Sequence, residues 1–261
     1  MNLKGIVLFD IDGVIRDVSS SYRKAIQETV SYFTQWSPSI SDIDLLKEEG
    51  CWNNDWEASL ELIKRYQLKL SSADTIPDLK KVIRVFNSFY FGGDPEGNPS
   101  QWGGFINNET LLAKKELFKR LDSQGIRWGF VSGAEAPSAR FVIHNRLGLN
   151  KAPLIAMGDA PDKPNPSGLI RLATQLAGKK LGKGIVPIAY LGDTVADVLT
   201  IINARKIIPS QTFISLAIAP PHLHSKSLIH AREKYEYRLK EAGADIIIKT
   251  NYDILNEFIF Q

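Results

Sequence analysis

Two aspartates near the N-terminus are the first side chains in this sequence that could carry out chemistry. Asp10 and Asp12 occur in the segment FDIDGV, directly after the apolar run that begins at Gly5. Ligand sites in open parallel sheets lie beyond the carboxyl ends of the strands, so two carboxylates here favour a chemical role. An EF-hand calcium loop is excluded, because its fifth and twelfth positions would be Val14 and Ser21 instead of Asp or Asn and Glu. A solvated turn is the structural alternative.

Three further motifs place polar side chains after apolar runs or at the start of a helix. Ser132 and Gly133 follow one such run, and Lys163 lies among prolines that fix the backbone at a helix entrance. Asp193 and Asp197 are four residues apart, so a helix that begins between them lets both carboxylates face one crevice. Each motif alone has an ordinary explanation: a Ser-Gly turn, a solvated lysine, or acids that cap a helix.

Short apolar runs alternate with helical patterns, which predicts βαβ units and an α/β fold with a Rossmann-like parallel sheet covered by helices on both faces. The runs are apolar throughout, as buried parallel strands are. The predicted strands are Gly5–Phe9, Arg127–Val131, Pro153–Ala156, Val186–Leu191, Phe213–Ala217 and Asp245–Ile248. The predicted helices between the later strands are Glu109–Gln124, Ser138–Leu147, Pro166–Leu176 and Ala196–Ala204.

The interval between the first and second predicted strands has a different character. No strand is expected in it, and helical periodicity predicts helices at Ser20–Phe33, Ser41–Glu48, Asp55–Leu68 and Pro77–Phe89. A stretch rich in Gly, Pro and Asn, residues 92–99, then leads back to the sheet. We interpret the interval as a helical cap inserted after the first strand.

The ordered set of Asp-x-Asp, Ser, Lys and Gly-Asp-x-x-x-Asp resembles the haloacid dehalogenase-like hydrolase superfamily. The spacing is similar to that of its subfamily with an α-helical cap between the first and second motifs. The resemblance covers essentially the whole chain, and the segments around Asp10 and Asp193 are its most specific parts. It implies a core domain formed by residues 1–16 and 105–261, with a cap domain formed by residues 17–104.

The resemblance implies phosphoryl transfer from a phosphate ester, because relatives that act on carbon–halogen or phosphonate bonds lack the second aspartate. Asp10 would attack phosphorus, and Asp12 would protonate the leaving alcohol and then deprotonate water. Ser132, with the neighbouring amide of Gly133, would hold phosphoryl oxygens, and Lys163 would stabilise the developing charge.

The same resemblance implies a Mg²⁺ cofactor held by carboxylates at the strand ends. The implied ligands are Asp10, the backbone carbonyl of Asp12, and Asp193. Asp197 would bind the metal directly or orient its waters. The implied activity is hydrolysis of a small phosphorylated metabolite through an aspartyl-phosphate.

Two other functions remain open from the sequence. The related β-phosphoglucomutases share both aspartates but carry a histidine twelve residues after the nucleophile, where this chain has Tyr22. A non-catalytic binding protein on the same fold is the second alternative. All the implied catalytic positions are filled here, which argues against it.

The segment that joins the second and third cap helices faces substrate in capped relatives. Trp52, Asn53, Asn54 and Asp55 are therefore the predicted specificity residues, with packing of the tryptophan and helix capping by Asn54 or Asp55 as the alternatives. Arg16 follows the first motif and is expected either to meet substrate or to extend its charged end to solvent.

Composition limits the partners. The 32 basic and 29 acidic residues give a net charge of +3 without long basic blocks, so no nucleic-acid partner is expected. The sequence shows no signal peptide and no apolar window of membrane length, which predicts a cytoplasmic chain without membrane contact. We expect a monomer or homodimer. The single cysteine, Cys51, is interpreted as a structural thiol.

Two C-terminal features have ordinary explanations. His222 and His224 follow a proline pair, and a surface loop is favoured over a transition-metal site because no third ligand is suitably spaced. Residues 225–241 read as a charged helix that covers a sheet edge, with a dimer contact as the alternative.

Overall fold

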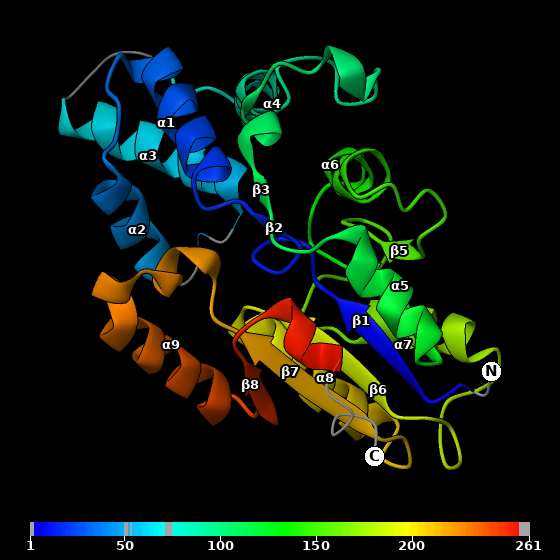
Figure 1. Cartoon of the computed structure of the whole chain (residues 1–261). Coiled ribbons are helices and arrows are strands. Elements are labelled where there is room, and N and C mark those ends of the chain that lie inside the picture. The colour runs from blue at the N-terminus through cyan, green and yellow to red at the C-terminus, as the bar shows by residue number, and fades with distance from the viewer. Residues whose placement is uncertain (1–2, 50–51, 53, 71–74, 256–261) are drawn as a thin grey trace. The chain divides into compact units, whose positions relative to one another are not determined.

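The computed structural model describes residues 3–49, 52, 54–70 and 75–255. Its main feature is a six-stranded parallel sheet in the order β5-β4-β1-β6-β7-β8 (Figure 1). The strands are β1 (Gly5–Phe9), β4 (Ile126–Val131), β5 (Leu154–Ile155), β6 (Ile188–Gly192), β7 (Phe213–Ile218) and β8 (Ile246–Ile248). All six predicted strands are confirmed. The first strand along the chain lies centrally, so its C-terminal residues emerge at the middle of the sheet edge.

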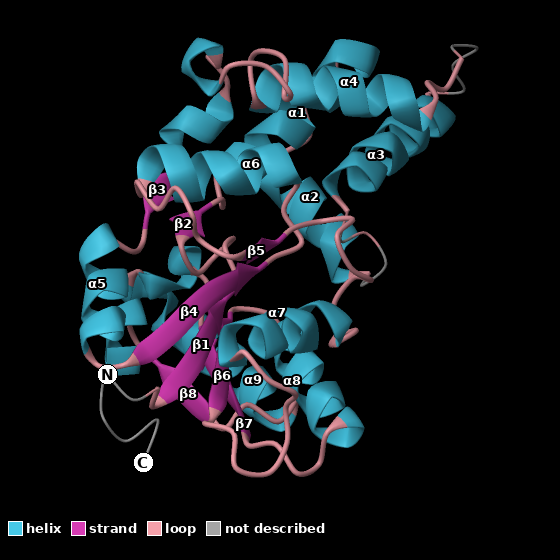
Figure 2. Ribbon diagram, turned by 90° about the vertical axis from the view of Figure 1, so that its right-hand side faces the viewer, coloured by secondary structure: helices cyan, strands magenta, loops and turns pink. Residues whose placement is uncertain are grey.

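Helices cover both faces because alternate side chains of each strand point to opposite sides. Val7 and Phe9 belong to a core with α5 (Lys115–Ser123), whereas Ile6 and Leu8 belong to a core with α7 (Ser167–Ala177) and α8 (Val195–Ile207). Figure 2 shows α5 on one side of the sheet and α7 and α8 on the other. The predicted α/β class is confirmed.

The helix predicted at residues 138–147 is divided into two kinds of turn. α6 (Ala136–Arg140) is followed by a π-helical segment, Phe141–Arg146. The amide of Leu147 bonds to the carbonyl oxygen of Val142 at 3.0 Å, a five-residue interval typical of that wider turn.

The expectation of no strand between β1 and β4 is wrong. β2 (Arg16–Asp17) and β3 (Thr110–Leu111) form a short antiparallel pair, and the helix predicted from residue 109 consequently begins only at Lys115. The amide of Leu112 extends the pairing by donating to Ile15 O at 2.8 Å. Two-residue strands carry no periodic signal, so sequence patterns could not reveal them.

The chain between β2 and β3 is helical. It contains α1 (Ser21–Thr34), α2 (Ile40–Glu48), α3 (Asp55–Lys69) and α4 (Leu79–Tyr90), close to the four predicted ranges. Residues 18–109 form one compact unit, the helical unit, and residues 1–17 with 110–261 form another, the sheet unit. No helix in the described part of the chain is long and apolar enough to cross a bilayer.

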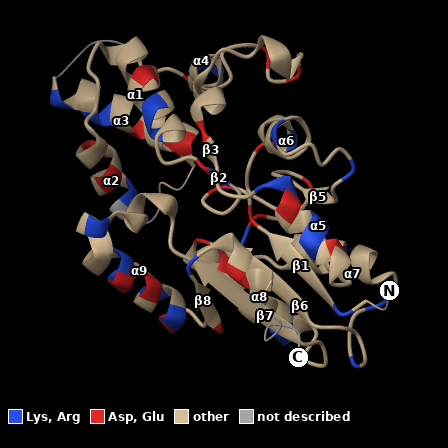
Figure 3. Ribbon diagram, in the orientation of Figure 1, with Lys and Arg blue, Asp and Glu red and all other residues tan. Residues whose placement is uncertain are grey.

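The predicted charged helix near the C-terminus corresponds to α9 (Ile229–Glu241), preceded by a 3₁₀ turn at Lys226–Leu228. Figure 3 shows acidic and basic residues interspersed along α9. Leu239 on its inner face packs with Val198 of α8 and Ala217 of β7. The helix therefore packs on the sheet unit, as the prediction of a covering helix requires.

Candidate active site

Asp10 is the first residue after the central strand, and its side chain is buried. Its residue exposure is 4%, and its amide donates to the carbonyl oxygen of Leu191 on the neighbouring strand at 2.8 Å. Oδ2 lies 3.1 Å from Nζ of Lys163. Oδ1 is buried and forms no hydrogen bond with any described residue. The two carboxylate oxygens of Asp10 are thus inequivalent, and one has unfilled bonding capacity.

The loop after Asp10 is tight, and a glycine is required in it. The amides of Val14, Ile15 and Arg16 lie within 3.3 Å of the carbonyl oxygen of Ile11. Gly13 has a φ of 74°, a conformation that side chains other than glycine rarely adopt. A Cβ atom there would also lie 2.0 Å from Oδ2 of Asp193. The glycine therefore permits the loop to approach the acidic end of β6.

Asp197 begins helix α8 together with Thr194, and its bonding capacity is filled. Its Oδ2 accepts from the amide of Thr194 at 3.0 Å and from Thr194 Oγ1 at 2.6 Å. Its Oδ1 lies 2.6 Å from Lys163 Nζ and 2.9 Å from the hydroxyl of Tyr190. A carboxylate offers about four lone-pair positions, so Asp197 is placed to hold Lys163.

Lys163 joins the two aspartates. Burial opposes its charged form, but the carboxylates of Asp10 and Asp197 outweigh burial and hold the pKa of Lys163 well above its usual range. Burial raises the pKa of Asp197. The charge of Lys163 and the hydrogen bonds from Lys163 and Thr194 lower it by more, so the net shift of this pKa is downward. The pair is thus a fixed ammonium and a fixed carboxylate, with the ammonium also facing Asp10.

Asp10 and Asp193 are held in an environment that opposes their charge. Burial raises the pKa of Asp10 to about 7, with Lys163 partly opposing the shift and the carboxylates of Asp197 and Asp12 adding to it. Burial, followed by the carboxylates of Asp197 and Asp10, raises the pKa of Asp193 well above its usual range. Ligand oxygens of Asp10, Asp193 and Asp197 lie within 4.8 Å of one another. Three carboxylates near one lysine, with a buried oxygen lacking a partner, fit a divalent cation.

The Ser-Gly motif follows β4, the strand beside β1. Ser132 is 7% exposed, and its Oγ accepts from the amide of Ala134 at 3.2 Å. A Cβ atom on Gly133 would meet nothing within 4 Å, so the space beside its amide is open. Ser132, Gly133 and Lys163 all line one small cavity. The sheet therefore brings the second and third motifs to the same place.

Comparison with known proteins assigns the chain to a family. A model described as haloacid dehalogenase-like hydrolase matches residues 5–205. The chain belongs to the haloacid dehalogenase-like hydrolase family. The predicted family and its α/β fold are confirmed.

The relatives of this haloacid dehalogenase-like hydrolase differ in how much of their own length matches this chain. An imidazoleglycerol-phosphate dehydratase from Phytophthora nicotianae is 30% identical over 245 residues, which are 93% of this chain and 49% of the relative. The chain thus spans about half the length of that relative. A structure described as a predicted phosphoglycolate phosphatase from Haemophilus somnus 129PT covers 100% of this chain and 99% of its own, with TM-score 0.65 and 16% identity. The structure of Phosphatase Tt82 from Thermococcus thioreducens covers 90% of this chain and 99% of its own, with TM-score 0.59 and 22% identity. These structures share the fold.

The structure excludes one of the two alternatives for Arg16 in this hydrolase. Its side chain has 0% exposure, so it does not extend its charged end to solvent. Nε donates to Oδ1 of Asp12 at 2.7 Å, while Asp12 keeps 26% side-chain exposure. The β2–β3 pair, which sequence patterns did not reveal, carries Arg16 inward. The guanidinium therefore fixes the orientation of Asp12.

The predicted specificity segment of the hydrolase is partly described. Asn54 caps α3, since its Oδ1 accepts from the amides of Trp56 at 3.0 Å and Glu57 at 3.2 Å. Trp52 Nε1 donates to Glu49 Oε2 at 2.9 Å. Asn53 and Cys51 lie outside the described residues. For Asn54, the structure shows the capping alternative.

Tyr190 and Thr194 complete the setting of Asp197, and neither was predicted as a site residue. Tyr190 is fully buried in β6, and its hydroxyl also lies 2.9 Å from the carbonyl oxygen of Val131. The available signal was a hydroxyl-bearing ring in an otherwise apolar strand. Thr194 was recognisable from its place three residues before Asp197, the spacing of a capping box.

Among the described residues, the histidine pair belongs to no cluster of metal-ligating side chains. His224 Nε2 lies 2.8 Å from the carbonyl oxygen of Ala219, in the loop after β7. In the part of the chain that the structure describes, the cluster with suitable ligand atoms is formed by the three aspartates. The surface-loop interpretation of the histidine pair is favoured.

Proposed function

We propose that the chain is a Mg²⁺-dependent phosphatase that hydrolyses a small phosphorylated metabolite through an aspartyl-phosphate on Asp10. The observation that carries the proposal is the setting of Asp10: a buried carboxylate with one oxygen beside Lys163 and the other without a partner among the described residues. A nucleophile that attacks a phosphate dianion needs nearby positive charge and freedom from competing hydrogen bonds.

Each motif residue has a role in this proposal. An oxygen of Asp10 forms a bond to phosphorus as the ester P–O bond breaks, and Asp12 gives its proton to the departing alcohol. Water then attacks phosphorus, Asp12 accepts its proton, and phosphate leaves with Asp10 restored. Lys163 and Ser132, with the Gly133 amide, hold the phosphoryl oxygens throughout.

The cation would be held by Asp10, Asp193 and the backbone carbonyl of Asp12, because both oxygens of Asp197 already accept hydrogen bonds. When bound, Mg²⁺ supplies positive charge that offsets repulsion between these carboxylates and the phosphate. Asp197 would act instead by fixing Lys163.

We propose that residues 17–104 act as the cap of this enzyme and select the leaving group. Asn53 remains a candidate specificity residue, and so does Trp52 through its ring, since its Nε1 is already bonded to Glu49. Asn54 is better explained as the N-cap of α3.

The name of the curated relative suggests which phosphate esters to assay first. Its name describes a dehydratase of imidazoleglycerol phosphate, a phosphate ester that bears an imidazole ring. Dehydration is not transferred to this chain, because the matching sequence here carries hydrolase motifs. We propose phosphate monoesters of imidazole-bearing alcohols as the first group to test.

A sugar-phosphate mutase is the second enzyme candidate that the motifs allow. Its expected histidine is replaced by Tyr22, whose ring stacks on Tyr90 with centroids 4.7 Å apart inside the helical unit. Substoichiometric sugar bisphosphate separates the two: a mutase would isomerise sugar phosphate without net phosphate release.

The test is phosphate release by the purified chain from a panel of phosphorylated metabolites and p-nitrophenyl phosphate, with Mg²⁺ or chelator. The matched control is folded Asp10→Asn. Phosphate release by the wild type but not by the variant supports the proposed phosphatase activity. Equal and negligible release by both across the panel would leave a non-catalytic protein on this fold as the better conclusion.

A further inference from the structure

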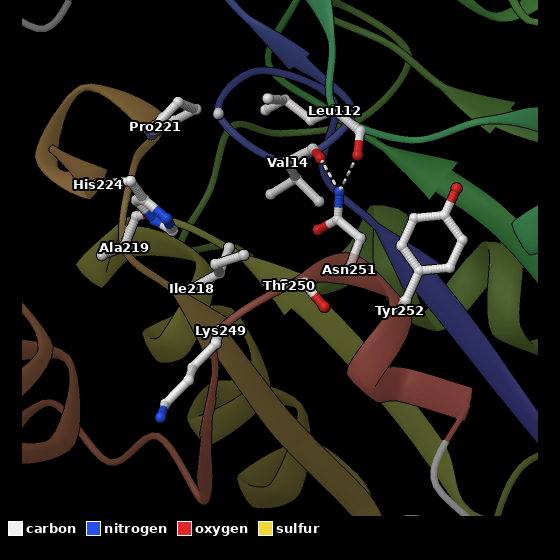
Figure 4. A pocket seen from close by; sticks show the side chains of 11 residues that line it. Val14, Leu112, Ile218, Ala219, Pro221, His224, Lys249, Thr250, Asn251 and Tyr252 are labelled. Atoms are coloured by element: carbon white, nitrogen blue, oxygen red, sulfur yellow. Dashed lines mark hydrogen bonds between the residues drawn. The ribbon is translucent and has the colours of Figure 1, made fainter.

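A second cavity of about 340 Å³ opens in the sheet unit beside the Asp12 loop (Figure 4). Gly13 and Val14 form one side, and the chain that follows β7 and β8 forms the others. Asp10, Lys163, Asp193 and Asp197 do not line it. The cavity lies where β1, β7 and β8 end, the edge at which open α/β sheets bind ligands, and its size is that of small-molecule sites.

Most of the lining is apolar. Leu112, Val14, Ile218, Ala219 and Pro221 all contribute to the walls. Lys249 lies at the rim, and Figure 4 shows its side chain extending away from Asn251. The hydroxyl of Thr250 is engaged with Asp253 at 3.1 Å. These walls favour an occupant with an apolar body, and the rim lysine disfavours a cation.

Asn251 supplies a buried acceptor without a partner in the described part of the chain. The residue is 4% exposed, and its Nδ2 donates to the carbonyl oxygens of Val14 and Leu112. Its Oδ1 is buried and forms no hydrogen bond among the described residues. Figure 4 shows this oxygen turned to the side of the cavity where His224 lies. An unpaired buried acceptor is costly, and a ligand donor would satisfy it.

His224 offers a second acceptor. A carbonyl oxygen only accepts, so the 2.8 Å contact with Ala219 O requires a hydrogen on Nε2, and the tautomer that leaves Nδ1 as an acceptor satisfies it. Asn251 and His224 thus present acceptors to the cavity, while Tyr252 and Lys249, which also line it, carry donor groups.

We propose that this cavity binds a small uncharged molecule with a flat apolar ring and an N–H group that donates to Oδ1 of Asn251. The ring lies against the apolar walls. Asn251 also holds the carbonyl of Val14, so the ligand contacts the segment that begins one residue after Asp12. Binding requires no phosphatase activity.

Indole is the probe, and benzofuran is its matched control, since benzofuran keeps the shape but replaces N–H with oxygen. Titration of the full chain is followed by the amide resonances of Gly13, Val14, Ala219 and Asn251. Indole should produce saturable shifts at these positions. Benzofuran should bind at least about tenfold more weakly, because it leaves the buried acceptor unpaired.

A cavity-filling variant locates the site. Leu112→Trp should remove indole binding, whereas Ile207→Trp, at an exposed position outside the cavity, should preserve it. If Leu112→Trp does not fold, the two probes on the wild type still decide. Absence of saturable indole shifts at the cavity, or equal affinity for both probes, would overturn the proposal.

Discussion

The two units differ in whether their polar side chains have hydrogen-bond partners. The comparison is between the carboxylates of the sheet unit and the polar side chains near Trp52 in the helical unit. Asp10 keeps a buried oxygen without a hydrogen bond, and Asp193 is buried among like charges. Asn54, in contrast, is occupied by two helix amides, and Trp52 by Glu49. Unsatisfied or repelling groups indicate a place for a ligand, whereas satisfied groups indicate structure. The difference supports the proposal that the chemistry takes place in the sheet unit.

Removal of the cation tests the contrast with the largest expected effect. Chelation should lower phosphate release by about 10³-fold or more, since charge stabilisation worth several kcal/mol is lost. Mg²⁺ should restore the rate and Ca²⁺ should not, because calcium forms longer bonds with looser geometry. Rates are measured at saturating p-nitrophenyl phosphate. Full activity in excess chelator would contradict a metal-assisted reaction.

The role of Arg16 predicts a smaller and more selective effect. Arg16→Met removes the hydrogen bond to Asp12, so proton transfer to the leaving group should suffer. We expect kcat/KM to fall about 10–100-fold for alkyl phosphates and much less for p-nitrophenyl phosphate, whose leaving group needs little protonation. Arg16→Lys, which keeps the charge, is the control. Equal losses for both substrates would assign Arg16 a purely structural role.

Sequence patterns were sufficient for most of the sheet and for the convergence of its motifs. Apolar runs bounded by turn residues identified all six strands, and parallel strands necessarily bring their carboxyl ends to one edge. Asp10, Lys163 and Asp197 accordingly meet despite their separation in the sequence.

The remaining features depend on tertiary context. The β2–β3 pair is too short for a periodic pattern, and it is this pair that turns Arg16 inward. Tyr190 acquires its role only because the fold brings Val131 of β4 and Asp197 of α8 within reach of its hydroxyl. Asn251 approaches Val14 from the far end of the chain, which no local pattern reveals.

The charge of Asp10 predicts a pH-dependent stability in the metal-free protein. Its folded pKa of about 7 exceeds the ordinary value of 3.8, so folding takes up a proton between these limits. The stability of the wild type should therefore fall as pH rises from 5 to 7 and level off above. Asp10→Asn lacks this titrating group. The Tm of this variant minus the Tm of the wild type should therefore increase by several degrees between pH 5 and pH 7. Calorimetry in chelator measures it; a difference independent of pH would contradict the burial argument.

The smallest effect is expected in the helical unit. Asn54→Ala should lower the free energy of unfolding by about 1 kcal/mol through loss of the α3 cap, and Asn54→Asp should retain it. Phosphate release from every substrate should change by less than about threefold, as expected when only a cap is lost. Denaturant unfolding and kcat/KM provide the two readouts. A large loss confined to one substrate would return Asn54 to the specificity residues.

The central claim is that Asp10 becomes covalently phosphorylated. Acid quenching during turnover, borohydride reduction and peptide mass spectrometry test it directly, because reduction converts an aspartyl-phosphate into homoserine. Homoserine at position 10, dependent on both substrate and Mg²⁺, is the predicted result, with Asp12 unmodified in the same peptide. Turnover without homoserine at position 10, or with modification at Asp12 instead, would contradict the account.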